Sequence, residues 1–437
     1  PSDYDEWEAM GNSGWSWAGV LPYFKRAENN ARFTDDYHGK GGPQPVNDSF
    51  TDNPMNKVFL EAAQQAGYPV SPDFNGAQPE GVGIYQVTQK DGERWSAARA
   101  YLEPNLSRPN LTVLTGARAQ RVMFDGRRAN GVQYRHGRHV EAVGARREVI
   151  LSAGTFQSPQ LLMLSGIGDG QALQNLGIKV LKHLPGVGTN LQDHLDYTLI
   201  YRARSLDLIG ASPRGMLRFM REIGRYRSER RGMLCTNVAE AGGFLKTDRS
   251  LPRPDIQLHF CVAIVHNHGR TLQHLWHGYS LHVCVLRPAS RGQVKLASSN
   301  PGEAPLIDPA YLSDPRDLEA LVRGFKLARR ILEAPAFSLL CGKELFSAGV
   351  VSDADICALI RARAETIYHP VGTCRMGRDK AAVVDASLKV HGVQGLRVVD
   401  ASVMPTHIGG NTNAPTMMIA EKAADMLHDG SRTGAST

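Results

Sequence analysis

The segment spanning residues 148–166 constrains the fold of this chain more than any other part of the sequence. Its first residues, 148–152, form a compact apolar run that predicts a buried strand. Gly154 then provides a turn, and we expect a helix with Ser158 as its N-cap and Pro159 at its first position. A strand that leads through a glycine into a helix is half of a βαβ unit. This pattern favours an α/β protein with a doubly wound sheet, although a purely structural corner has the same pattern.

The chain length predicts two domains, because 437 residues exceed what one hydrophobic core usually organises. Further apolar runs at 111–115, 119–124 and 396–400 predict strands, and residues 416–427 have the spacing of a closing helix. No run approaches the roughly 18–20 apolar residues that a membrane-spanning helix needs. The sequence therefore predicts a globular protein with at most peripheral membrane contact.

A net charge of +7 requires an explanation, because basic proteins often bind nucleic acid or anionic lipid. No nucleic-acid motif accompanies the charge, so we expect no nucleic-acid partner. The one dense cluster lies at 214–231, which carries seven arginines, with Met216, Phe219, Met220 and Ile223 spaced for one helical face. This segment could rest on an anionic membrane or be a solvated helix. The solvated helix is favoured, and we expect no firm anchoring.

The six cysteines are scattered and form no CxxC pair, which favours reduced thiols and a cytoplasmic location. Six histidines fall between His259 and His282, and they leave a metal-binding protein as an alternative. Their spacing matches no known catalytic metal motif, so we expect no metal. These histidines are His259, His266, His268, His274, His277 and His282.

Three strings of residues carry a family resemblance. Residues 154–168 read GTFQSPQLLMLSGIG, residues 184–194 read LPGVGTNLQDH, and residues 368–377 read YHPVGTCRMG. GLRVVDASVMP at 395–405 and NTNAPT at 411–416 extend the match. Together they resemble the glucose–methanol–choline (GMC) oxidoreductase family over residues 1 to about 428, in particular its alcohol- and choline-oxidising members. The resemblance implies an FAD-binding, Rossmann-like domain and an α+β substrate domain whose antiparallel sheet roofs the flavin.

The same resemblance implies a set of site residues. His369 is placed as the catalytic base, with Asn413 as its partner beside the flavin. Glu240 has a weaker counterpart on the substrate side, and a structural carboxylate is an equally good interpretation. The residues implied to bind FAD are Ala153, Gly154, Thr155, Asp400, Ala401 and Asn411.

The residue types suit alcohol oxidation. The flavin takes a hydride from the carbon, and the protein must take the hydroxyl proton. An imidazole can accept that proton at neutral pH, and an uncharged amide can hydrogen-bond the substrate oxygen without competing for it. We therefore expect oxidation of a primary alcohol, choline-like, aliphatic or aromatic, to its aldehyde. A quinone or another acceptor is favoured over oxygen, which makes the protein a dehydrogenase.

No GxGxxG motif occurs in the chain, and it opens at Pro1 without an initiator methionine or signal peptide. We therefore expect the family's first βαβ unit, which grips the FAD pyrophosphate, to be missing. For the same reason we expect the chain as given to hold FAD poorly and to turn over little alcohol, and a non-catalytic fragment that binds no FAD remains an alternative. The expected FAD domain comprises 95–196 and 366–430, the substrate domain 197–365, and residues 1–94 form an N-terminal segment on the flavin-loop and substrate side.

Overall fold

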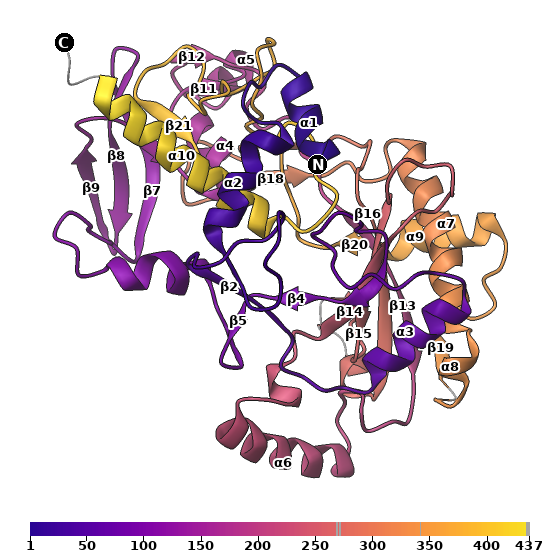
Figure 1. Ribbon diagram of the computed structural model, residues 1–437. Coiled ribbons are helices and arrows are strands. Elements are labelled where there is room, and N and C mark those ends of the chain that lie inside the picture. The colour runs from indigo at the N-terminus through magenta and orange to yellow at the C-terminus, as the bar shows by residue number, and fades with distance from the viewer. Residues whose placement is uncertain (268–269, 271, 341, 434–437) are drawn as a thin grey trace.

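A seven-stranded antiparallel sheet organises one half of the molecule (Figure 1). The computed structural model describes residues 1–267, 270, 272–340 and 342–433. The sheet runs in the order β19-β13-β16-β15-β14-β3, with β20 also paired to β13. Its strands are β3 (Gly81–Ile84), β13 (Leu195–Arg202), β14 (Ala239–Leu245), β15 (Ile256–Cys261), β16 (Gly278–Val285), β19 (Lys343–Leu345) and β20 (Glu365–Thr366).

The two faces of this sheet differ because side chains alternate along a strand. On β15, Leu258 and Phe260 face an apolar core, while Gln257 and His259 are buried on the opposite, polar face. Phe325 and other apolar residues of α7 pack against the first face. The helices associated with this core are α3 (Met55–Gln65), α7 (Pro315–Leu332), α8 (Pro335–Ser338) and α9 (Asp353–Arg363).

A second core lies under two parallel strands that are distant in sequence. In the register, Val149 of β10 (Val149–Leu151) pairs with Leu396 of β21 (Leu396–Val398). This core is covered by α4 and by the long α10, which crosses that half of the molecule in Figure 1. The elements that contribute to this core are α1 (Ser2–Ala9), α2 (Trp17–Ala27), α4 (Gly154–Leu164), α5 (Gly170–Asn175), α10 (Asn413–Thr433), β7 (Ala117–Asp125) and β8 (Arg128–His136). The exposed β9 (His139–Gly144) pairs with β8.

Two local predictions are wrong. Residues 111–115 form no strand; they are exposed, so burial does not hold them extended. Helix α4 begins at Gly154, five residues before the predicted first position, and Ser158 and Pro159 lie inside it. Pro159 lacks the N–H that would bond the Thr155 carbonyl one turn earlier. The Thr373 hydroxyl donates to that carbonyl at 2.6 Å instead, so a long-range contact makes the early start possible.

The 95–196, 366–430 and 197–365 domain boundaries stay a prediction.

Cys235, Cys261, Cys284, Cys357 and Cys374 are free thiols, and Cys341 lies outside the described residues. Within the described chain, no helix combines the length and the apolarity needed to cross a bilayer. The remaining elements are β1 (Glu28–Asn30), β2 (Gln44–Asp48), β4 (Gln86–Val87), β5 (Gln89–Lys90), β6 (Glu93–Arg94), η1 (Ala98–Leu102), η2 (Glu103–Asn105), β11 (Ile167–Gly168), β12 (Lys182–His183), α6 (Pro213–Glu229), η3 (Met233–Cys235), η5 (Leu272–Leu275), β17 (Gln293–Lys295), β18 (Leu306–Asp308) and η6 (Ala401–Val403).

Candidate active site

His369 lies where the polar face of the sheet meets the second core. It follows β20 and is buried. Asp193 accepts a hydrogen bond from its backbone N–H at 2.9 Å, and His407 Nε2 bonds its carbonyl at 2.7 Å. The backbone on both sides of the imidazole is therefore fixed by residues from other parts of the chain, which holds the ring in one orientation.

The hydrogen bonds around His369 assign its tautomer. His194 Nε2 lies 2.7 Å from the Leu286 carbonyl, which can only accept, so this nitrogen carries the proton. In neutral His194 the Nδ1 atom is then an acceptor, and it lies 3.0 Å from His369 Nδ1. His369 Nδ1 must therefore be the donor, which leaves His369 Nε2 with a free lone pair.

An amide donor faces that lone pair. Asn411 Nδ2 lies 3.0 Å from His369 Nε2, and Gln257 Nε2 donates to Asn411 Oδ1 at 3.1 Å. Gln257 also bonds the hydroxyl of Tyr85, which itself donates to the Leu258 carbonyl at 2.6 Å. Gln257, itself bonded to Tyr85, therefore holds the Asn411 oxygen, so the NH2 group of the Asn411 amide points at His369 Nε2.

Burial keeps this group of histidines neutral. Burial first, and the proximity of His407 second, lower the pKa of His369 to about 4. Burial lowers the pKa of His407 to about 4 and that of His194 well below its usual range. Burial, with His282 and His369 nearby, lowers the pKa of His259 to about 3. At neutral pH His369 is therefore in the form that can accept a proton.

The start of α4 lies directly beside the His369 loop. The Thr155 hydroxyl donates to the Pro370 carbonyl at 2.7 Å. Gly154 adopts a φ of +83°, and no atom lies within 4 Å of the position that a Cβ would take. Ala153 is the N-cap and supplies no capping side chain. The positive end of a helix dipole and an open glycine backbone therefore face the same space, which suits an anionic cofactor.

Asp400 holds this corner together. Its Oδ2 accepts from the Gly154 N–H at 2.9 Å and from the Ser158 hydroxyl at 2.5 Å. Its Oδ1 accepts from the N–H and the hydroxyl of Ser402 at 2.8 and 2.5 Å. Both carboxylate oxygens are thus engaged in joining α4 to η6, and the half-buried Ala401 opens η6. Asp400 shapes the turn around the expected cofactor position.

The other implied residues are placed differently. Asn413 opens α10, is exposed, and makes no recorded contact with His369; the amide on His369 Nε2 comes from Asn411. Glu240 is buried on β14, where Thr51 and Asn56 donate to it at 2.6 and 2.5 Å and Thr236 donates to its other oxygen. It lies on a recess that also includes Arg218 and Glu222.

Sequence reasoning missed three partners of this site: His194, Gln257 and Tyr85. His194 was part of the recognised 184–194 string, which contained the only sequence signal for its role. Gln257 and Tyr85 stand in ordinary strand or loop context. Their role follows from the sheet, which brings β15 and the end of β3 over the His369 loop.

The histidines between His259 and His282 do not assemble into a metal site among the described side chains. His259 stacks on Tyr85, His277 bonds the Leu208 carbonyl and Ser212, and His282 pairs with Asp196 at 2.5 Å. His266 contacts Arg363. His268 and the side chain of His274 lie outside the described part of the structure.

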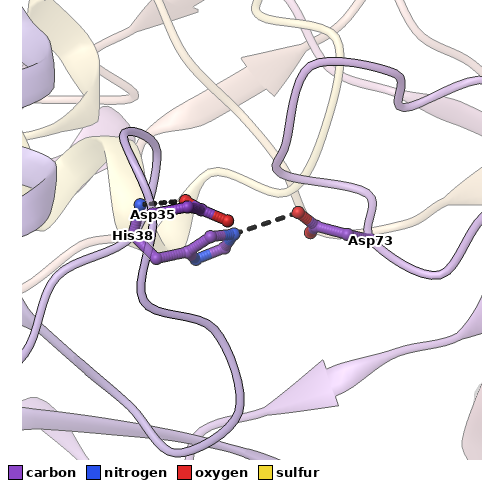
Figure 2. A group of neighbouring side chains, drawn as sticks. All are labelled: Asp35, His38 and Asp73. Atoms are coloured by element: carbon purple, nitrogen blue, oxygen red, sulfur yellow. Dashed lines mark hydrogen bonds and ion pairs between the residues drawn. The ribbon is translucent and has the colours of Figure 1, made fainter.

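One other group has the composition of a metal site within the described residues: Asp35, His38 and Asp73, with potential ligand atoms within 4.8 Å of one another. In Figure 2, Asp73 points at the imidazole from a separate loop. His38 Nε2 lies 3.1 Å from Asp73, and its Nδ1 lies 3.2 Å from Glu28. Burial opposes the charge, but hydrogen bonds to Glu28 and Asp73 raise the pKa of His38 to about 9. A protonated imidazole therefore already supplies the positive charge between these carboxylates.

Comparison with known proteins gives the same family for both halves. The GMC oxidoreductase models match residues 1–196 and 288–420. The chain is 47% identical to an alcohol dehydrogenase [acceptor] of Pseudomonas putida, over 97% of this chain and 78% of that protein. It is 45% identical to human mitochondrial choline dehydrogenase, over 97% and 72%. The crystal structure of pyridoxine 4-oxidase from Mesorbium loti superimposes with a TM-score of 0.86 at 32% identity, covering 98% of this chain and 81% of that one.

Proposed function

Because the chain belongs to the GMC oxidoreductase family, we propose that it oxidises a primary alcohol to its aldehyde with His369 as the base. Its fold is the α/β FAD-binding fold of this family together with a substrate domain, and its reaction is FAD-dependent oxidation of a CH–OH group. The observation that supports His369 most directly is the chain of hydrogen bonds from Leu286 through His194, which leaves His369 Nε2 unprotonated.

FAD, when bound, supplies a two-electron acceptor for the hydride that leaves the alcohol carbon. The open space beside Gly154 and the start of α4, whose N-cap Ala153 supplies no side chain, fit such a cofactor. Ala153, Gly154 and Thr155 would hold it on one side, with Ala401 and the first residues of α10 nearby. Asp400 contributes by fixing Gly154 and Ser402.

The protein's own part in the reaction is the handling of one proton. A substrate hydroxyl that replaces the Asn411 amide at His369 Nε2 would place its oxygen about 2.6–3.2 Å from that nitrogen, the heavy-atom distance that proton transfer needs. Asn411, held by Gln257, is then close enough to donate to the substrate oxygen as negative charge develops. Burial excludes water that would otherwise compete for the base. Asn413, from the resemblance, is the alternative donor.

The substrate is a small-molecule alcohol and the electrons pass to an acceptor. We favour a quinone or a similar acceptor over oxygen, because the P. putida relative carries the word "acceptor" in its name. Choline-like, aliphatic and aromatic alcohols remain candidate substrates. A cytoplasmic location, with at most peripheral membrane contact, completes the proposal.

The proposal is tested by adding FAD to the purified protein, removing unbound flavin, and supplying alcohols anaerobically. Choline, an aliphatic primary alcohol and benzyl alcohol form the panel. With the family's N-terminal βαβ unit joined to the chain, we expect at least one alcohol to bleach the flavin absorbance, and we expect His369→Ala to retain flavin without bleaching. A protein that binds no flavin would instead support the alternative of a non-catalytic fragment, and bound flavin that no alcohol reduces would contradict the proposal.

Glu240 provides a test of substrate class. If its carboxylate recognises a cationic head group, Glu240→Gln raises the KM for choline and leaves that for an aliphatic alcohol unchanged. An equal effect on both alcohols, or a lower melting temperature alone, assigns Glu240 the structural role that its three donors suggest.

A further inference from the structure

Helix α6 faces the body of the protein with its charged side. Arg218, Glu222 and Arg225 are spaced at i, i+4 and i+7, which places them on one face. Arg218 pairs with Asp207 at 2.8 Å, and Arg225 binds both oxygens of Asp52 at 2.6 and 3.1 Å. Glu222 is buried and accepts from the Met233 N–H at 3.0 Å. Ion pairs and hydrogen bonds therefore attach this helix to the protein.

The opposite side of α6 is apolar and faces solvent. Met216, Leu217 and Met220 have exposed fractions of 58%, 74% and 61%, and Phe219 has 42%. Figure 1 shows α6 at the edge of the molecule, away from the sheet. A surface helix normally buries its apolar side and exposes its charges. The reversed orientation of α6 indicates that its apolar face meets another apolar phase.

A neighbouring turn enlarges this surface. The Leu275 carbonyl accepts from the Ala211 N–H at 2.6 Å, which places the end of η5 beside the start of α6. Leu275 and Trp276 are 42% and 38% exposed. Trp276 also lies under the guanidinium of Arg202, whose carbon is 4.5 Å from the ring centroid. Tryptophan is enriched at membrane–water boundaries, where its ring meets apolar groups and its N–H meets water.

Positive charge surrounds the apolar residues. Arg214, Arg221 and Arg227 are exposed, and none of them pairs with a carboxylate of the described chain. The protein as a whole carries a net charge of +7. Two copies of this face would bring like charges together, which disfavours self-association. A partner with an apolar interior and an anionic surface could bury the methionines and pair with the arginines at the same time.

We propose that α6 and the Leu275–Trp276 turn form a docking surface for the anionic face of a lipid bilayer. The contact is peripheral and reversible. The apolar side chains enter the boundary of the acyl chains, and the arginines lie among the lipid phosphates. This inference goes beyond alcohol oxidation and does not depend on it. It also replaces the solvated-helix interpretation of the sequence, while weak binding agrees with the expectation that the segment gives no firm anchor.

Vesicle flotation with the full chain tests the proposal. Vesicles of phosphatidylcholine alone are compared with vesicles that contain phosphatidylglycerol, at about 0.02 M and about 0.5 M salt. We expect binding to the anionic vesicles at low salt and its loss at high salt. Combined Met216→Ser, Leu217→Ser and Met220→Ser should weaken binding about 10-fold or more. Combined Arg214→Gln, Arg221→Gln and Arg227→Gln should weaken it about 10- to 100-fold.

Two matched variants control for general loss of hydrophobicity and charge. Val140→Ser with Val143→Ser removes exposed apolar groups from β9, and Arg118→Gln with Arg135→Gln and Arg138→Gln removes exposed charge from β7 and β8 and the turn after β8. Both should bind vesicles as the unmodified protein does, and all variants should keep the same melting temperature. Equal binding by the α6 and control variants would overturn the proposal. So would a self-associated form that only the α6 variants disrupt, since it would identify a second copy as the occupant.

Discussion

His369 and His38 are both buried histidines, yet their surroundings drive their protonation in opposite directions. His369 is surrounded by neutral partners, a second imidazole and an amide, and burial lowers its pKa to about 4. His38 lies between the carboxylates of Glu28 and Asp73, and despite burial its pKa is raised to about 9. The comparison shows that burial alone does not fix the state of a histidine. A neutral environment produces a base, and a carboxylate environment produces a structural cation.

The largest expected effect is on chemistry. We predict that His369→Ala lowers alcohol turnover by ~10²–10⁴-fold while flavin remains bound, because the hydroxyl proton then lacks an acceptor. The measurement is steady-state turnover of flavin-loaded protein with an artificial acceptor. The exposed His136 provides the matched control, since His136→Ala should change nothing. Turnover of His369→Ala within about twofold of the unmodified protein would contradict the assignment of the base.

The second prediction concerns the loss of folding stability at low pH. His194, His259, His369 and His407 all have lowered pKa values in the folded protein, so the unfolded chain binds more protons than the folded one below about pH 6.5. Stability that is present above that pH is therefore lost as the pH falls towards 4 and 3. His369 and His407, whose pKa values are lowered to about 4, each contribute on the order of 3 kcal/mol.

Urea unfolding between pH 7 and pH 4 measures this loss. A variant with a neutral, non-titrating replacement, His259→Gln, should have a flatter pH dependence than the unmodified protein. His259 suits this test because urea unfolding reads stability rather than turnover, and because its ring stacks on Tyr85 instead of hydrogen-bonding to His369. An unchanged slope would show that its environment does not suppress protonation.

The third prediction has the opposite sign. Because the folded pKa of His38 is raised, its contribution to stability is fully present below about pH 6.5 and disappears as the pH rises through about 9. We expect His38→Gln to lower the free energy of unfolding by about 2 kcal/mol at pH 6 and by much less at pH 10. Thermal unfolding at the two pH values tests this. A pH-independent effect would assign His38 a packing role only.

The smallest expected effect separates two asparagines. We predict that Asn411→Ala slows anaerobic flavin reduction about tenfold, because one preorganised donor is lost beside His369 Nε2. Asn413→Ala should slow it several-fold if the family resemblance places it correctly. A larger effect at Asn413 than at Asn411 would show that the amide next to His369 changes when cofactor and substrate bind.

The sequence by itself determined the family, the strand–glycine–helix unit around Gly154, and His369 as the base candidate. These features are strings of consecutive residues, and local periodicity and turn chemistry leave a direct trace in such strings. Local patterns failed at 111–115, where apolar residues lie exposed, and at Ser158, where Thr373 allows α4 to start earlier.

The tertiary structure alone decided which groups touch. His194 meets His369 across 175 residues, Gln257 orients Asn411 across 154, and Asp73 reaches His38 from another loop. It also decided that α6 turns Arg218, Glu222 and Arg225 towards the body of the protein and its methionines outward, although the sequence spacing is compatible with either orientation. Sequence periodicity predicts which residues share a face of a helix or strand. Only packing against distant segments decides whether that face contacts the protein or the solvent.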